Sequence, residues 1–241
     1  RKAKGAATLS GRWPRFFLLL AVFLALSSCK VENTADLSAS DILDVLAGKQ
    51  VTVPLDIQIS ATVSAEQAAK TADDIVGAFA ATFPDIKYRG FKETDGMENQ
   101  LNFRATVPVT KWSDDNISND TVSIIVEEKD RNAKIYIGSN PNKIAIARKR
   151  MTDKNFMSTI EDGNIIFSIK FGNDTRVPLQ FACGDVFANG KPVVWNDKPV
   201  TLQRRDTVDI TLSNYQDSLL LGRSDVLVYV GALSLPKETG N

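Results

Sequence analysis

Oxygen-bearing side chains crowd one short loop of the sequence, residues 112–120, which reads WSDDNISND. Calcium takes six to eight oxygen ligands, so a loop of this composition is a conceivable calcium site. The spacing differs from that of an EF-hand, because no glycine and no distal glutamate stand at the required positions. We therefore favour a solvated turn and predict neither a metal nor a cofactor. If the loop did bind calcium, the ligands would include Asp114, Asp115 and Asp120.

A second group of carboxylates, Glu93, Asp95 and Glu98, surrounds a predicted hairpin turn. Paired carboxylates can act as acid and base in glycoside hydrolysis. Carboxylates at a tight turn are usually solvated, however, and catalysis needs acids that converge in one cleft. We therefore predict no catalytic residue and expect that the protein is not an enzyme.

The absence of histidine from the sequence excludes several kinds of site. It removes Ser-His-Asp and Cys-His catalysis, together with the commonest zinc ligand. Of the two cysteines, Cys29 and Cys183, the second is expected to be a small buried core residue. An intermolecular disulfide and a reactive thiol are the alternatives for Cys183.

Charge argues against a nucleic-acid partner. Residues 1–28 contain five basic residues and no acidic one, so the remaining chain has 24 basic and 29 acidic residues. That remainder contains no lysine- and arginine-rich patch of the nucleic-acid type. The short basic run at 148–150 falls late in a predicted helix, where cations complement the helix dipole.

The elements that would position these side chains follow from the hydrophobic pattern. Strict alternation over 51–63 predicts a strand, and an apolar stripe over 64–83, opened by Ser64 as the helix cap, predicts a helix on its face. Strands at 86–93, 100–110, 121–128 and 133–137 and a helix at 140–154 complete an α+β lobe. Its expected core comprises Ile75, Val76 and Phe79 of the helix with Leu55, Ile57, Ile59, Phe103 and Ala105 of the sheet, and Phe79→Ala should cost roughly 3–5 kcal/mol.

After residue 163 the pattern contains only strands, at 165–171, 177–187, 193–195, 207–212 and 226–230, with a hairpin turn at Asn189-Gly190. The predicted fold class is therefore α+β: an antiparallel sheet with packed helices, similar to a split βαβ unit, followed by a mostly-β, sandwich-like lobe. The predicted divisions are a signal peptide (1–28), a segment with a tether and a short helix capped by Ser40 (29–48), the α+β lobe (49–157) and the β-rich lobe (158–241).

The segment 15–30, RFFLLLAVFLALSSCK, has the three parts of a secretory signal. Basic residues precede an apolar run, and small residues follow it. The run is too short for a transmembrane helix, which needs about 20 apolar residues. Its end, Leu26-Ser27-Ser28-Cys29, resembles the lipobox of bacterial lipoproteins. The resemblance implies cleavage before Cys29 and acylation of this cysteine, which anchors the chain in a lipid bilayer.

Lys30 follows the cysteine, where an aspartate is the usual inner-membrane retention signal among enterobacterial lipoproteins. The resemblance therefore implies an outer-membrane location with the domain facing the periplasm. Small lipoproteins of mobile elements that modify the host envelope are similar in size and layout, which suggests such an element as the source of the gene.

We expect a non-enzymatic lipoprotein that binds or scaffolds another envelope protein. The alternatives are a carboxylate-dependent hydrolase of periplasmic polymers and a small-ligand carrier that uses a groove between helix and sheet.

Overall fold

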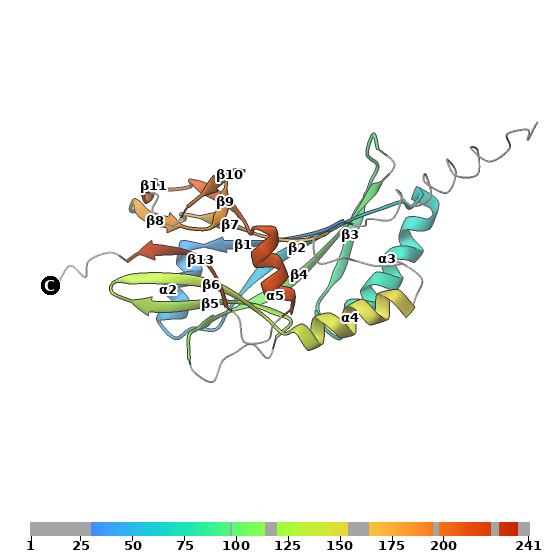
Figure 1. Cartoon of the computed structure of the whole chain (residues 1–241), viewed down its shortest axis with the longest axis horizontal. Helices are drawn as coiled ribbons and strands as arrows, with labels where there is room; N and C mark the ends of the chain where they lie inside the picture. Colours follow the sequence, from blue (N-terminus) through green and yellow to red (C-terminus); the bar gives the residue numbers. More distant parts are fainter. Residues whose placement is uncertain are drawn as a thin grey trace, which may run out of the picture.

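The computed structural model describes residues 30–96, 98–113, 120–153, 164–194, 198–222 and 227–235. About 50% of this part of the chain is strand and 24% is helix. Its strands form one sheet that curls into a half-barrel (Figure 1). The predicted α+β class is therefore wrong, because the protein is mostly β and the strands of both predicted lobes share a single sheet.

Twelve strands follow one another in the order β10-β9-β12-β7-β1-β2-β4-β5-β6-β13-β8-β11, and β3 pairs with β4 beside this path. The strands are β1 (Lys30–Ser38), β2 (Val51–Ala61), β3 (Lys87–Lys92), β4 (Asn99–Lys111), β5 (Val122–Lys129), β6 (Asn132–Ser139), β7 (Ile165–Gly172), β8 (Leu179–Cys183), β9 (Val186–Ala188), β10 (Lys191–Val193), β11 (Val200–Leu202), β12 (Thr207–Thr211) and β13 (Leu227–Ser234). The helices are α2 (Ala39–Leu46), α3 (Ala65–Phe79), α4 (Pro141–Asp153) and α5 (Asn214–Gly222).

Strand β1 occupies the segment that the sequence analysis expects to be a polar tether. It pairs antiparallel with β2 and parallel with β7, so it lies inside the sheet. Val31, Asn33, Ala35 and Leu37 alternate with more exposed residues and are buried. The hydrophobic pattern did not predict this strand, because the polar Asn33 interrupts an otherwise apolar alternation.

Two helix caps differ from the expected ones. Ser38, rather than Ser40, caps α2: its hydroxyl accepts the N–H of Asp41, and the Asp41 carboxylate accepts the N–H of Ser38 at 2.8 Å. Ser64 precedes α3 but makes no side-chain capping bond. Helix α2 covers β1, β2, β4 and β5, whereas α3 lies against β3 and α4 (Figure 1).

The second half of the chain departs further from the predicted pattern. The predicted strand over 177–187 is two strands, β8 and β9, which pair with different neighbours. Asp185 between them has a φ of 59°, a left-handed conformation that interrupts the strand. Helix α5 was not predicted. The hairpin turn at Asn189-Gly190 is confirmed, with φ values of 49° and 74°.

Contacts across the interior hold the curled sheet. The rings of Phe171 in β7 and Phe181 in β8 stack with their centroids 4.6 Å apart. The buried Asn173 follows β7, and its Nδ2 atom donates to the carbonyl oxygens of Val177 at 2.9 Å and Leu202 at 2.8 Å. Because Leu202 ends β11, this amide ties two distant parts of the sheet together.

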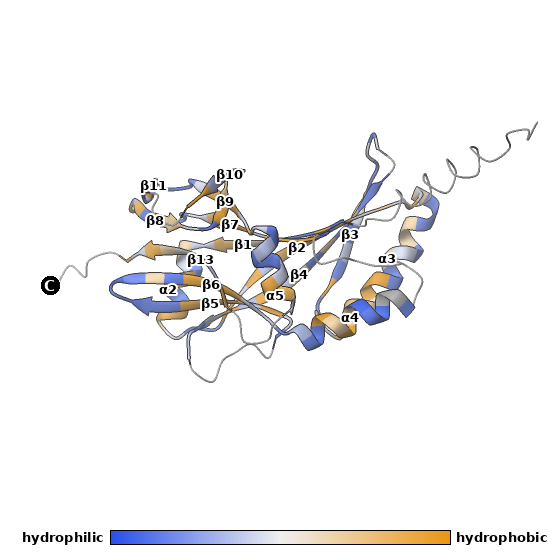
Figure 2. Ribbon diagram, viewed as in Figure 1, coloured by the Kyte–Doolittle hydropathy of each residue, from blue (hydrophilic) through white to orange (hydrophobic). Residues whose placement is uncertain are grey.

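The expected core residues belong to one hydrophobic cluster, although not equally. Ile75, Phe103 and their partners in β2 are buried. Figure 2 shows that the strands of the sheet carry both hydrophobic and hydrophilic residues. Phe103 is 1% exposed and its ring lies 5.5 Å from that of Tyr88. Phe79 is only partly buried and contacts the rim of the cluster. The predicted cost for Phe79→Ala is therefore too large.

We expect Phe103→Ala to lower the free energy of unfolding by about 3–5 kcal/mol, because it leaves a cavity in the centre of the sheet. Phe79→Ala should lower it by only about 1–2 kcal/mol, since less apolar area becomes exposed. Urea unfolding followed by far-UV circular dichroism measures both. Equal losses for the two variants would contradict the burial difference described here.

Candidate functional site

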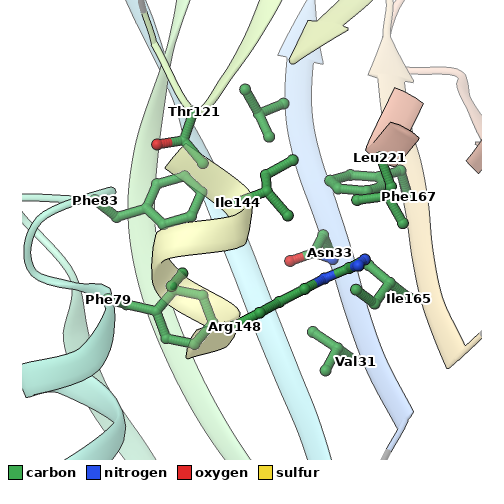
Figure 3. Close-up of a pocket in the computed structure, with 12 residues that line it drawn as sticks. Val31, Asn33, Phe79, Phe83, Thr121, Ile144, Arg148, Ile165, Phe167 and Leu221 are labelled. Carbon is green, nitrogen blue, oxygen red and sulfur yellow. The ribbon is translucent and has the colours of Figure 1, made fainter. Parts of the chain in front are cut away.

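A pocket lies between the helices α3, α4 and α5 and the sheet strands β1 and β7. It encloses about 510 Å³ of empty space, its open mouth included. We call it the helix–sheet pocket (Figure 3). The walls are almost entirely apolar, and the residues that form them are Val31, Asn33, Phe79, Phe83, Thr121, Val122, Ile144, Ala147, Arg148, Ile165, Phe167 and Leu221.

Local sequence spacing explains why these side chains meet. Phe79 ends α3 and Phe83 follows it, with their ring centroids 6.2 Å apart. Ile144 and Arg148 stand four residues apart on α4 and therefore point to the same side of the helix. Ile165 pairs with Val31 in the parallel ladder, so both contribute to the floor.

Arg148 is the only charged residue among the described residues that line this pocket. Its side chain runs from α4 across the pocket toward Asn33 and Ile165 (Figure 3). The Nε and Nη2 atoms are buried. The Asn33 amide beside it donates to the carbonyl oxygen of Ile166 at 3.3 Å. The pocket thus combines an apolar wall with one positive charge.

The sequence pattern places Arg148 only in the basic run at the end of a helix. A signal for its position was present, because Arg148 follows Ile144 by four residues and Ala147 by one. Both of those apolar residues are buried. Lys149 and Arg150, the other members of the run, are exposed.

A buried acid, Asp217, stands close to the same pocket. It lies on α5, is 1% exposed, and its carboxylate accepts the N–H of the wall residue Phe167 at 3.2 Å. Desolvation raises the pKa of Asp217 to about 7, although the bond from Phe167 opposes this rise. No sequence pattern pointed to this residue.

The acidic residues proposed from sequence do not form a site in the part of the chain that the structure describes. Asp114 and Asp115 lie outside the described residues, and Asp120 is exposed next to a shallow hollow. Glu93 and Asp95 are exposed at the turn between β3 and β4. No group of three or more carboxylates or cysteines in the described ranges could hold a metal ion.

Of the two residues predicted to anchor and sort the protein, only Lys30 is among the described residues. Cys29 lies outside the described residues, and Lys30 begins β1 with an ion pair to Glu32 at 2.5 Å. Cys183 is partly buried at the end of β8, packed against the core and opposite Gly231 of β13. None of the helices that the structure describes is long and apolar enough to cross a membrane.

Trp112 and Trp195 flank turns of the sequence, a position for which core or rim packing is expected rather than contact with a ligand. Trp112 is 41% exposed, and its ring packs on Tyr136 with centroids 5.8 Å apart, which confirms rim packing. Trp195 lies outside the described residues.

A second, wider hollow lies where the two ends of the sheet approach each other. We call it the seam; it encloses about 1270 Å³ with its open side and is lined by residues of β8, β10, β11 and β12. Apolar side chains are unusually exposed near it: Val194 is 68% exposed, Val200 53% and Phe187 39%. Such exposure is typical of surfaces that contact another molecule.

We expect the raised pKa of Asp217 to make stability depend on pH. Between about pH 4 and pH 7 the folded protein keeps a proton that the unfolded chain releases, so the free energy of unfolding falls as pH rises through this window. Asp217→Asn removes this dependence, and above pH 7 it should stabilise the protein by up to about 4 kcal/mol.

Urea unfolding at pH 4, 5.5 and 8 measures this effect. Asp209→Asn, which removes an exposed carboxylate from β12, controls for the change in net charge. A constant difference between Asp217→Asn and the unchanged protein at all three pH values would contradict the prediction.

One protein-family model matches nearly all of the strands and helices described above. Neither the curated proteins nor the solved structures include a match to this chain. Residues 31–234, from the second residue of β1 to the end of β13, match a family described as "Domain of unknown function (DUF7424)". The match covers most of the chain, which therefore belongs to the DUF7424 family.

Proposed function

We propose that the protein is a lipid-anchored lipoprotein of the bacterial outer membrane, without enzymatic activity, that binds another envelope protein at its seam. The observation that carries the proposal is the pair of sheet ends that meet at an open hollow with exposed apolar side chains. Lipidation of Cys29 and sorting by Lys30 rest on the resemblance of the leader to a lipobox.

The start of β1 supports an anchored domain held close to the bilayer. Lys30 is already part of the sheet, so a lipid on the preceding residue would have no tether of its own. The end of the sheet that begins with Lys30 would then face the membrane surface. Ser60 of β2 and Ile165 of β7 lie at the same end, beside Lys30 and Val31.

The seam lies at the other end of β1. Thr207, one of its lining residues, pairs with Gly172, and Gly172 pairs with Ser38, the last residue of β1. Nine residues of strand at about 3.3 Å each place the two ends roughly 26 Å apart. An anchored domain would therefore present the seam away from its own membrane, where a partner has access.

The free strand edges differ in how well they are protected. An exposed edge offers unpaired N–H and C=O groups to another strand, and lysine, proline or a bulge blocks this. Edge strand β10 contains Lys191 and Pro192, and β3 contains three basic residues with irregular pairing at Tyr88 and Gly90. Strand β11, Val200-Thr201-Leu202, has none of these features. It is the edge best suited to pair with an extended segment of a partner.

The hydrolase alternative has less support. The carboxylates that it would use, Glu93, Asp95 and Glu98, stand around the turn between β3 and β4. Asp217 has a raised pKa, but its carboxylate is buried and bonded to the backbone of Phe167.

We expect the anchor to depend on Cys29 alone. Several acyl chains, each contributing about 0.8 kcal/mol per buried CH₂, would hold the protein firmly in the membrane. Cells that express the full chain are labelled with an alkyne fatty acid. The unchanged protein should carry the label and fractionate with the outer membrane, whereas Cys29→Ala should be unlabelled and remain uncleaved or soluble.

The other cysteine provides the matched control, because Cys183→Ala removes a thiol from the folded domain and should keep both label and location. Lys30→Asp should move the protein to the inner-membrane band of a density gradient. A labelled or mature-sized membrane-bound Cys29→Ala protein would contradict the lipobox interpretation.

We expect partner contact at the β11 edge and not elsewhere on the exposed surface. A photo-crosslinking amino acid is placed at Val200 of the full chain, expressed in the bacterium that encodes it. Irradiation should yield one adduct that peptide mass spectrometry identifies as an envelope protein.

Ile146 on α4 is a matched position, because it is also a large apolar residue and is 48% exposed. The same crosslinker at Ile146 should give no such adduct. Equal adducts from the two positions, no adduct from position 200, or an adduct only with a second copy of this chain would each refute partner binding at β11.

A further inference from the structure

We propose that the partner segment bound at the seam is an acidic β-strand, in which apolar residues alternate with aspartate or glutamate. This inference rests on the proposed function and deepens it, because it states the chemistry of the segment that pairs with β11. It follows from three features of the seam: the strand edges that border it, its apolar floor and the basic side chains at its rim.

Both ends of the sheet border the same hollow, which leaves space for a further strand. Strands β10 and β11 are the two ends of the strand order, and residues of both line the seam (Figure 1). Of these two edges, β11 lacks the lysine and proline that block β10. An extended segment along β11 would lengthen the sheet into the hollow, with its backbone N–H and C=O groups bonded to those of β11.

The floor of the seam determines every second residue of such a segment. Phe181, Leu202 and Val208 line the hollow and are buried, whereas Val200 is 53% exposed on the same face of β11 as Leu202. A strand added beside β11 places alternate side chains on this face, next to Val200. Apolar side chains there would remove Val200 from water, and polar ones would lose hydrogen bonds to water without replacement. Alternate positions should therefore be apolar.

The rim of the seam determines the residues in between. Its exposed basic side chains are Lys191, Lys198, Arg204 and Arg205. In the part of the chain that the structure describes, none of the four forms an ion pair with a carboxylate. The segment 191–206 contains four basic and two acidic residues, whereas the chain from residue 29 onward has 24 basic and 29 acidic ones. A basic rim on an otherwise acidic domain attracts and orients an acidic segment.

An acidic residue, Asp206, also lines the seam. Its Oδ2 atom accepts the N–H of Gln203 at 2.8 Å, which holds this carboxylate within the turn between β11 and β12. One carboxylate does not offset the four basic side chains, so the rim favours a segment with aspartate or glutamate over one with lysine or arginine.

Synthetic peptides test the proposal on the full chain, purified in a neutral detergent. One short fluorescent peptide alternates glutamate with valine and another alternates lysine with valine, so the two share an apolar face and differ in charge. Fluorescence anisotropy should show that the glutamate peptide binds about tenfold more tightly, because exposed ion pairs replace repulsion at the rim. This preference should shrink as the salt concentration rises.

The combined change Lys191→Gln and Lys198→Gln should lower the preference for the glutamate peptide from about tenfold to about threefold, because it removes half of the rim charges. The combined change Lys87→Gln and Lys92→Gln is the matched control and should keep the preference. Both residues are exposed lysines of the edge strand β3, which lies away from the seam (Figure 1). Circular dichroism and the melting temperature establish that both variants are folded.

Methylation of the peptide nitrogens tests whether the segment pairs as a strand. Successive N–H groups of a strand point to opposite edges, so a peptide methylated only at its valines and one methylated only at its glutamates lose donors on different edges. One of the two should bind about tenfold more weakly than the unmethylated peptide, and the other should bind nearly as well. An equal effect of both methylation patterns contradicts pairing along β11.

The outcomes separate this proposal from partner binding itself. Equal affinity for the glutamate and lysine peptides overturns the acidic segment, even if the crosslinker at Val200 captures an envelope protein. So does an equal loss of preference in the two folded lysine variants. A charge preference without any adduct at Val200 supports the acidic segment and refutes the envelope partner. A dimer of this chain that dissociates when the glutamate peptide is added, measured by analytical ultracentrifugation, assigns the seam to a second copy and overturns both.

Discussion

Strand β1 forms an antiparallel ladder with β2 on one side and a parallel ladder with β7 on the other. The β1–β7 ladder joins segments that are far apart in the sequence, and without β1 the sheet would separate into two parts. Parallel pairing between distant segments closes a long loop, which costs conformational entropy and slows folding. We therefore expect β1 to pair with β7 late in folding, after the more local strand pairs.

Side chains on the inner face of β1 belong both to the hydrophobic core and to the helix–sheet pocket. Val31 and Asn33 line the pocket, and the next residues on the same face, Ala35 and Leu37, are buried in the core. Because successive residues of a strand alternate between its faces, the register that buries Leu37 also directs Asn33 toward Arg148. A shift by one residue would expose the apolar positions and remove the pocket floor together. The fold and the pocket are thus specified by the same ladder.

Strong periodicity made some elements predictable. The strands β2 and β4 have long, regular alternation and were located within two residues. The start of α4 was located within one residue, at Asn140-Pro141, where a polar cap precedes a proline in the first turn. The segment of β1 carries Asn33 in its apolar series, and α5 has buried polar residues, Gln216 and Asp217, on its inner side. Both segments owe their structure to tertiary contacts, which a local pattern does not contain. The same reason explains why Arg148 was assigned to the helix end instead of to the pocket.

The curled sheet also accounts for the exposed edge at the seam. A closed barrel removes strand edges, whereas a half-barrel leaves them and needs other protection. In β10 this protection is Pro192 with Lys191. The end of β11 is instead held by Asn173, whose side-chain amide donates to the carbonyl oxygen of Leu202. That bond fixes the end of β11 without covering its outer side, so Val200 remains exposed on an ordered strand. An edge held in place in this way binds a partner strand at a lower entropic cost than a mobile one, because its conformation is already set.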